Sequence, residues 1–219
     1  MPKPRIIAET KRPIPELRPP RASEVRPHEW LTEDSRALFD GKASVGTPLP
    51  VYLAASAETK VREHASRDAL RRLEVMGLLL GEVRSWNGEE YSVVIDSVTT
   101  ALRSSPAKVR FDPGAFPKLF CQLDESGFDY MILGWYHSHP GHTCFLSVRD
   151  LETQRAIFTE RYHCAMVVDP LNREIKVFRL SGDGYEEMPF GVVSDRVAVN
   201  GNPGGRRTRR LKVRPAARV

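Results

Sequence analysis

Cysteine is scarce in this chain: there are three among 219 residues, at positions 121, 144 and 164. An odd number with no paired spacing argues against a disulfide framework and against a cysteine-based zinc motif, and it fits a reducing compartment. We therefore expect Cys121, Cys144 and Cys164 to be small apolar core residues.

Long apolar runs are also missing. No segment approaches the roughly 20 apolar residues that a membrane-spanning helix needs, and the start of the chain, rich in Pro, Lys and Arg, does not resemble a signal peptide. These absences predict a soluble, cytoplasmic protein with no membrane role.

Acidic residues are few at both ends of the chain. Residues 203–219 contain seven Lys or Arg and no acid, and residues 1–27 contain seven against three. The two ends contribute +7 and +4 to the net charge of +5, which leaves −6 for residues 28–202. No aromatic platform or recognition helix accompanies the basic end, so we expect no primary role in nucleic-acid binding.

Proline and apolar patterning divide the chain into three parts. Residues 1–48 hold a Pro-rich, partly disordered extension with a short amphipathic helix at 28–39. Residues 49–190 form the main domain, and residues 191–219 form a basic flexible tail.

From residue 49 onward, segments with the pattern of strands alternate with segments of helical periodicity. The arrangement predicts an α/β protein with a curved mixed β-sheet flanked by helices. Asn87-Gly88 predicts a hairpin turn, and residues 104–113 read as an exposed loop or short edge segment. We expect strands at 49–55, 74–83, 91–101, 130–138, 163–169 and 173–180, and helices at 56–73, 114–126 and 147–161.

Two histidines stand at the end of the strand expected at 130–138. Because side chains two residues apart point to the same face of a strand, His137 and His139 can bind one ion, and Pro140 then ends the strand. Asp150 falls in the first turn of the next helix, where it can face the strand end. Two imidazoles and one carboxylate suit one zinc ion with an open coordination position, as in a catalytic site.

A second interpretation needs no metal. Ser147 and Asp150 have the spacing of a helix capping box, which accounts for the aspartate by itself. It does not account for two histidines on an otherwise apolar strand. His142 lies between these residues, and we interpret it as part of the rim of a cleft.

The sequence HSHP at 137–140, the Ser147 to Asp150 spacing and EVMGLLLGE at 74–82 together resemble the JAMM (MPN-plus) metalloprotease family. Within the family they resemble most the zinc deubiquitinases of the proteasome lid. The resemblance runs from about Val51 to Leu180 and implies the MPN fold, which is cytidine-deaminase-like. The short chain suggests an archaeal member.

The resemblance implies a role for five residues. His137, His139 and Asp150 would bind one zinc ion, Glu74 would act as the general acid/base, and Ser147 would stabilise the oxyanion. Some family members lack these residues and serve only as scaffolds, whereas this chain keeps all five. The resemblance therefore favours an active zinc metallo-isopeptidase.

The family's substrates imply the partners. We expect hydrolysis of the bond between the C-terminal glycine of ubiquitin, or a ubiquitin-like modifier, and a lysine, and maturation of a modifier precursor after Gly-Gly. A proteasome-type particle is a further expected partner, and the chain is expected to be a monomer or weak dimer. The alternative is an MPN-fold scaffold that docks through its terminal extensions.

The segment 104–113 matches an insertion that pairs with the C-terminal tail of ubiquitin in the family. Its alternating residues have the pattern of a strand, and a plain surface loop remains the alternative. The candidate substrate-binding residues are Lys108, Val109, Arg110 and Phe111.

Overall fold

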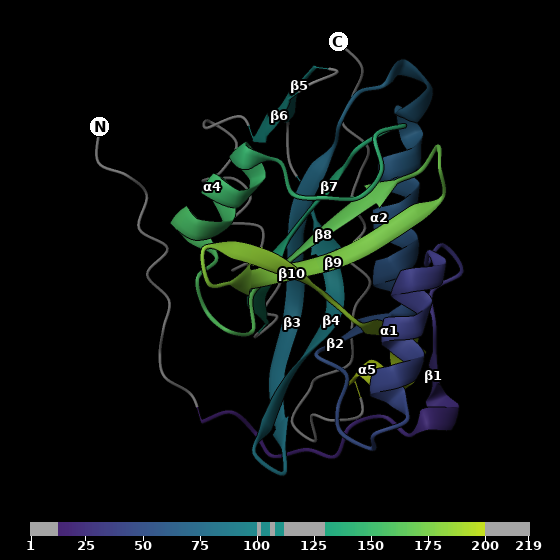
Figure 1. Cartoon of the computed structure of the whole chain (residues 1–219), viewed down its shortest axis with the longest axis vertical. Helices are drawn as coiled ribbons and strands as arrows, with labels where there is room; N and C mark the ends of the chain where they lie inside the picture. Colours follow the sequence, from purple (N-terminus) through teal and green to yellow (C-terminus); the bar gives the residue numbers. More distant parts are fainter. Residues whose placement is uncertain (1–12, 100–101, 106–107, 112–129, 200–219) are drawn as a thin grey trace.

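The computed structural model describes residues 13–99, 102–105, 108–111 and 130–199 (Figure 1). The helix expected at 114–126 and Cys121 lie outside these residues. The described helices are α1 (Glu33–Ala43), α2 (Ala55–Arg67), α4 (Val148–Ile157) and α5 (Asp195–Val199), with 3-10 turns at Ala22–Glu24 and Ala69–Arg71.

A mixed sheet of nine strands organises the described residues, in the order β1-β11-β2-β4-β3-β7-β8-β9-β10. The pairs β11–β2, β2–β4 and β7–β8 are parallel and the remaining pairs are antiparallel. The predicted α/β class with a mixed sheet flanked by helices is confirmed. The strands are β1 (Val25–Arg26), β2 (Val51–Ala54), β3 (Met76–Trp86), β4 (Glu89–Val98), β7 (Met131–Ser138), β8 (Cys164–Asp169), β9 (Glu174–Ser181), β10 (Gly184–Met188) and β11 (Phe190–Val193).

Alternate residues of the central strands enter two separate cores. Tyr136 and Met166 belong to the larger core, together with buried residues of α2, whereas Trp135 and Ala165 belong to a smaller core that includes Phe158 at the end of α4. Because successive side chains of a strand point to opposite faces, the two cores lie on opposite faces of the sheet. In Figure 1, α2 and α4 accordingly lie on opposite sides of the strands.

The hairpin predicted at Asn87-Gly88 is confirmed. Trp86 pairs with Glu89, and the two turn residues have φ of 51° and 81°. Two successive positive φ values are typical of the type I′ turn, whose twist matches that of the flanking strands. The turn therefore sets the register of β3 on β4 as far as the irregularity between Leu80 and Gly81. On its other side, β3 pairs with β7.

The amphipathic helix expected at 28–39 begins later, at Glu33. Thr32 is the N-cap, with its side chain accepting a hydrogen bond from Ser35 N, and this cap defines the helix start. Residue 28 instead lies in the core, where His28 Nε2 is 2.9 Å from Glu58 Oε1 on α2. Within the described residues, the N-terminal segment thus packs against the sheet; the three-part domain division stays a prediction.

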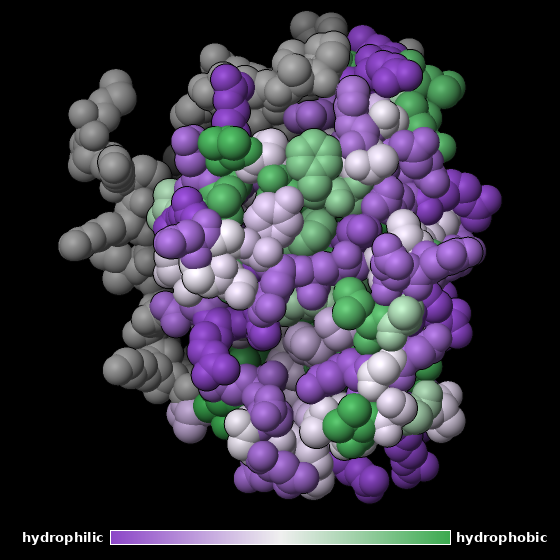
Figure 2. Space-filling view, in the orientation of Figure 1, coloured by the Kyte–Doolittle hydropathy of each residue, from purple (hydrophilic) through white to green (hydrophobic). Residues whose placement is uncertain are grey.

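The described surface is mostly hydrophilic on the face that Figure 2 presents, with hydrophobic side chains in small groups among the polar ones. Of the helices in the described ranges, none is long and apolar enough to cross a membrane. The two described cysteines, Cys144 and Cys164, are buried and free, as predicted.

Gly134 is required where β7 meets β8. Its φ is +146°, and a Cβ atom placed on it would lie 1.8 Å from the carbonyl oxygen of Cys164. Because backbone on a central strand pair cannot yield, we expect Gly134→Ala to lower the free energy of unfolding by more than about 3 kcal/mol. Urea denaturation measures this loss. Gly182→Ala is the control, because Gly182 also has positive φ but faces open space; equal losses in the two variants would contradict the explanation.

The lowered pKa of His64, on α2, leads us to expect that acid destabilises the fold. Its Nδ1 lies 2.8 Å from the Tyr136 hydroxyl, and burial, with the nearby Arg67 charge, lowers the pKa of His64 from 6.5 to about 4. Between these values the unfolded chain binds the proton and the folded chain does not. Stability therefore falls as the pH drops from 6.5 towards 4, by up to about 3 kcal/mol.

This dependence is checked by urea denaturation of the wild type and His64→Asn at pH 7 and pH 4.5. Asparagine keeps a hydrogen-bonding side chain but does not titrate in this range. We expect the wild type to lose more stability than the variant between the two pH values, and identical losses would contradict the role of His64.

Candidate metal centre

The candidate centre lies where β7 ends and α4 begins, on the face of the sheet that α4 covers. His137 follows two residues after Trp135, so both side chains point to this face, and their rings stack with centroids 4.4 Å apart and planes at 12°. Both side chains are buried. The indole thus fixes the plane of the first imidazole.

His139 lies just beyond the last residue of β7. Its backbone N–H donates to Val168 O at 2.9 Å, which extends the pairing with β8 by one residue before Pro140 ends it. His139 as a whole residue is 6% exposed. Both histidines are therefore held by the same parallel strand pair, and their imidazoles converge.

Three side-chain atoms meet at this point. His137 Nε2 lies 3.1 Å from His139 Nε2 and 3.4 Å from Asp150 Oδ2, and His139 Nε2 lies 3.7 Å from the same oxygen. Ligands of a tetrahedral zinc ion at about 2.0–2.1 Å would be about 3.3 Å apart. The three atoms form a possible metal site among the described residues, and their spacing fits zinc.

Hydrogen bonding orients the second imidazole. His139 Nδ1 lies 3.2 Å from Thr143 O, an acceptor, so Nδ1 carries the proton and the Nε2 lone pair faces the cluster. For His137, Nδ1 is buried and has no hydrogen-bond partner among the described residues. A lone pair and a carboxylate aimed at one point favour a cation there.

One oxygen of Asp150, Oδ2, takes part both in the helix cap and in the cluster with the two histidines. Its Oδ2 accepts hydrogen bonds from Ser147 N at 2.8 Å and Ser147 Oγ at 2.6 Å, while the same atom faces both imidazoles. The predicted capping box is therefore confirmed. Burial opposes ionisation, but the facing side chains of His137 and His139 and the hydrogen bond from Ser147 outweigh it, and the pKa of Asp150 lies well below its usual range.

Glu74 precedes β3 and is half-buried. Met76 pairs with His137, and Ser138 N donates to Val75 O at 2.9 Å, so the antiparallel register continues back along the chain. Met76 therefore shares a face of the sheet with His137, and Glu74 stands two residues before Met76, just outside β3. Its catalytic role remains a prediction.

The candidate substrate segment has strand structure. β6 (Lys108–Phe111) pairs antiparallel with β5 (Leu102–Ser105) in a separate two-stranded sheet. The strand-like alternation noted in the sequence fits this backbone. Contact of Lys108, Val109, Arg110 and Phe111 with substrate stays a prediction.

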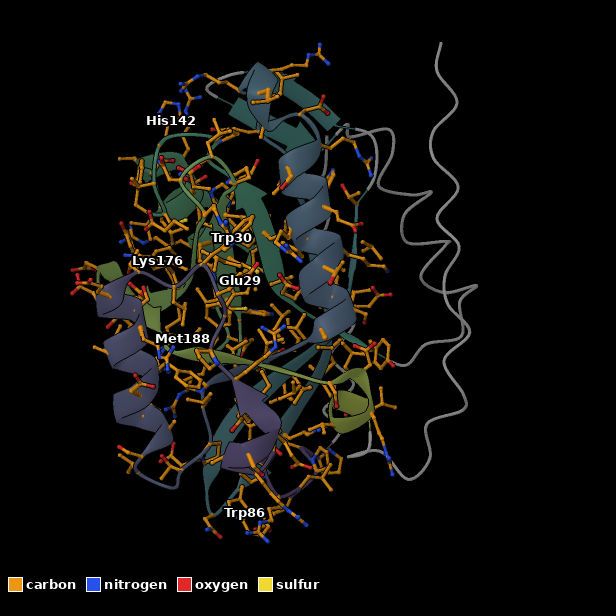
Figure 3. All side chains as sticks on the ribbon, turned by 90° about the vertical axis from the view of Figure 1, so that its right-hand side faces the viewer. Glu29, Trp30, Trp86, His142, Lys176 and Met188 are labelled. Atoms are coloured by element: carbon orange, nitrogen blue, oxygen red, sulfur yellow. The ribbon has the colours of Figure 1, made fainter. Side chains whose placement is uncertain are left out.

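Two neighbouring residues do not belong to the cluster. His142 is exposed on the loop after β7, which Figure 3 shows at the opposite end of the molecule from Trp86. Cys144 is buried, and its Sγ donates to Val167 O at 3.2 Å. Burial raises the pKa of the Cys144 thiol far above its usual value, so it stays protonated.

Sequence reasoning missed Thr143, whose carbonyl orients His139. Its φ of +62° is unusual for a β-branched residue, and no sequence pattern signals a threonine in this conformation. The resemblance pointed to the ligands and not to the groups that orient them.

The sequence of this chain is similar to those of subunits of two large complexes. The 26S proteasome non-ATPase regulatory subunit 14 of Dictyostelium discoideum is 36% identical over 59% of this chain and 43% of its own length. The ubiquitin carboxyl-terminal hydrolase RPN11 of Saccharomyces cerevisiae is 34% identical over 66% and 49%. The COP9 signalosome complex subunit 5 of Drosophila melanogaster is 31% identical over 73% and 49%. The chain thus spans less than half the length of these relatives.

Among solved structures, a Desulfitobacterium hafniense protein aligns with 66% of this chain and 93% of its own, at 23% identity and a TM-score of 0.47. This likeness is too low to carry the assignment. The decisive match is that of residues 47–160, more than half of the chain, to the family described as JAB1/Mov34/MPN/PAD-1 ubiquitin protease. That range includes all three residues of the possible metal site. The chain belongs to this family, the JAB or MPN family.

Proposed function

We propose that this protein is a zinc-dependent isopeptidase. Its substrate is the bond between the C-terminal glycine of ubiquitin, or a ubiquitin-like modifier, and a lysine, and it also matures modifier precursors after Gly-Gly. The observation that carries the proposal is the convergence of His137 Nε2, His139 Nε2 and Asp150 Oδ2 in a chain of this family. Members named as ubiquitin hydrolases support the substrate class.

His137, His139 and Asp150 would hold the ion. Zinc, when bound, supplies Lewis-acid polarisation of the scissile carbonyl and lowers the pKa of water to about 7. Three protein ligands leave one position for substrate chemistry, which distinguishes a catalytic site from a structural one.

Glu74 moves the proton. Its carboxylate takes a proton from the attacking water and later delivers it to the leaving lysine amine, so that one group acts as general base and then as general acid. The register of β3 on β7 supports this role, because Met76, two residues after Glu74, pairs with His137.

Ser147 stabilises the oxyanion. Asp150 Oδ2 accepts two hydrogen bonds from Ser147, one from the backbone N–H and one from the hydroxyl. The hydroxyl can therefore turn towards the developing negative charge while the N–H still holds the aspartate. A positioned donor of this kind stabilises the tetrahedral intermediate.

β6 binds the modifier's C-terminal tail by strand addition. An edge strand offers unpaired N–H and C=O groups that hold a flexible peptide extended. This strand consists of Lys108, Val109, Arg110 and Phe111, and within the described residues its one partner in the sheet is β5. Relatives named as 26S proteasome subunits support a proteasome-type particle as a further partner.

The test uses two substrates built on one ubiquitin-like modifier: a linear fusion with residues beyond Gly-Gly, and the modifier linked to a lysine peptide. Mass spectrometry identifies the products formed by the zinc-loaded protein. We expect cleavage directly after the second glycine in both, and no cleavage when that glycine is replaced by valine. A protein that binds zinc and cleaves neither substrate would support a scaffold instead.

A further inference from the structure

Asp169, the last residue of β8, is a buried carboxylate without a cation beside it in the described salt bridges. It is 0% exposed. Its two oxygens instead accept five hydrogen bonds, at 2.8–3.1 Å, and these lower the pKa of Asp169 despite its burial. The donors are Gly141 N, Thr143 N, Leu171 N, Asn172 N and Asn172 Nδ2.

Two of these donors belong to the loop that follows the second histidine. Gly141 N donates to Oδ1 and Thr143 N to Oδ2, each at 2.8 Å. The carboxylate therefore hydrogen-bonds the loop on both sides of His142. Figure 3 shows His142, the residue between these two donors, at one end of the molecule. The loop's shape is therefore set by a side chain on the neighbouring strand.

The loop conformation that these hydrogen bonds hold is unfavourable for Thr143 by itself. Gly141 has φ of +81° and Thr143 of +62°. For a β-branched residue, the left-handed region is sterically unfavourable, and it persists only where surrounding contacts hold it. The hydrogen bond from Thr143 N to Asp169 is such a contact.

The same peptide segment reaches the metal centre. Thr143 O accepts the hydrogen bond from His139 Nδ1 at 3.2 Å, which fixes the tautomer and the ring orientation of that ligand. A chain of contacts thus runs from Asp169 through Thr143 to His139.

We propose that Asp169 is a positioning residue of the zinc centre: it holds Thr143 in the left-handed conformation that aims its carbonyl at His139 Nδ1, and so sets zinc affinity. The inference rests on the metal centre of the proposed function. It does not require peptidase activity.

The test variant is Asp169→Asn, which keeps the size of the side chain. In either orientation of the amide, an NH₂ group replaces an oxygen that now accepts a backbone N–H of the loop, from Gly141 at Oδ1 or from Thr143 at Oδ2. Outer hydrogen-bond partners of metal ligands typically contribute 10–100-fold to affinity. We therefore expect the zinc dissociation constant, measured by competition with a chromogenic chelator, to rise by about 10–100-fold.

A purely structural role would lower stability without this change. Ile175→Val is the matched control, because Ile175 is buried on the adjacent strand β9 and the loss of one buried methylene group lowers stability. We expect this control to bind zinc like the wild type. The Co²⁺-loaded proteins give a second measurement: the visible spectrum should shift in Asp169→Asn and stay unchanged in the control.

Thr143→Gly gives a second comparison, because it replaces the residue that Asp169 is proposed to hold. Glycine adopts positive φ without the steric cost, so the loop no longer depends on the carboxylate to the same degree. We expect Asp169→Asn to weaken zinc binding less in the Thr143→Gly background than alone, but still measurably.

The outcomes separate two failures. If the wild type binds no zinc, the metal centre and this inference both fall. If the wild type binds zinc and Asp169→Asn binds it equally well in both backgrounds, only the positioning role is overturned.

Discussion

Glu74→Gln is expected to reduce the rate of cleavage by about 10²–10⁴-fold while zinc content stays at one ion per chain. Glutamine has nearly the same size but cannot take up a proton at neutral pH. Since Glu74 is assigned to proton transfer and not to metal binding, the loss should appear in kcat. Cleavage of the linear Gly-Gly fusion, with zinc measured by mass spectrometry on the same sample, checks both statements.

The control is Glu63→Gln, which makes the same chemical change at an exposed position of α2. It should retain wild-type cleavage. A decrease of less than threefold in Glu74→Gln would show that another group moves the proton. Loss of zinc in that variant would instead make Glu74 a ligand.

His139→Ala is expected to abolish stable zinc binding and, with it, cleavage. The substitution removes one of three converging atoms and leaves His137 and Asp150, which cannot complete a three-ligand site. Zinc content after gel filtration should fall from one ion per chain to near zero. Circular dichroism should show that the fold is retained, because the side chain lies at the end of β7 and outside both hydrophobic cores.

His142→Ala is the control for this loss. His142 lies three residues further on in the same loop, is exposed and is not part of the cluster. It should keep one zinc ion per chain. If His139→Ala retained zinc, or if His142→Ala lost it, the assignment of the ligands would be wrong.

Short-range patterns predicted much of the fold. The alternation of strand and helix gave the α/β class, and Asn87-Gly88 gave the hairpin, because these signals are local and strong. β1, β10 and β11 were not expected. β1 has two residues and β11 four, too few for a periodic pattern, and their place depends on partners far away in the sequence.

The metal centre was predictable to a different degree for each residue. His137 and His139 follow from strand geometry, and Asp150 from its place in the first turn of a helix. The role of Glu74 came from the resemblance alone. His137 follows Glu74 by 63 positions in the sequence, and only the pairing of β3 with β7 brings the two segments together. The orienting contacts of Thr143 and Asp169 depend on loop conformation, which sequence patterns do not encode.

The most direct test of the central claim is the rate of Gly-Gly fusion cleavage by one preparation in three states: zinc-loaded, stripped with a chelator, and stripped with one equivalent of zinc restored. The account predicts that chelation abolishes cleavage and that stoichiometric zinc restores it. Undiminished cleavage by the stripped protein, verified to contain no metal, would contradict it.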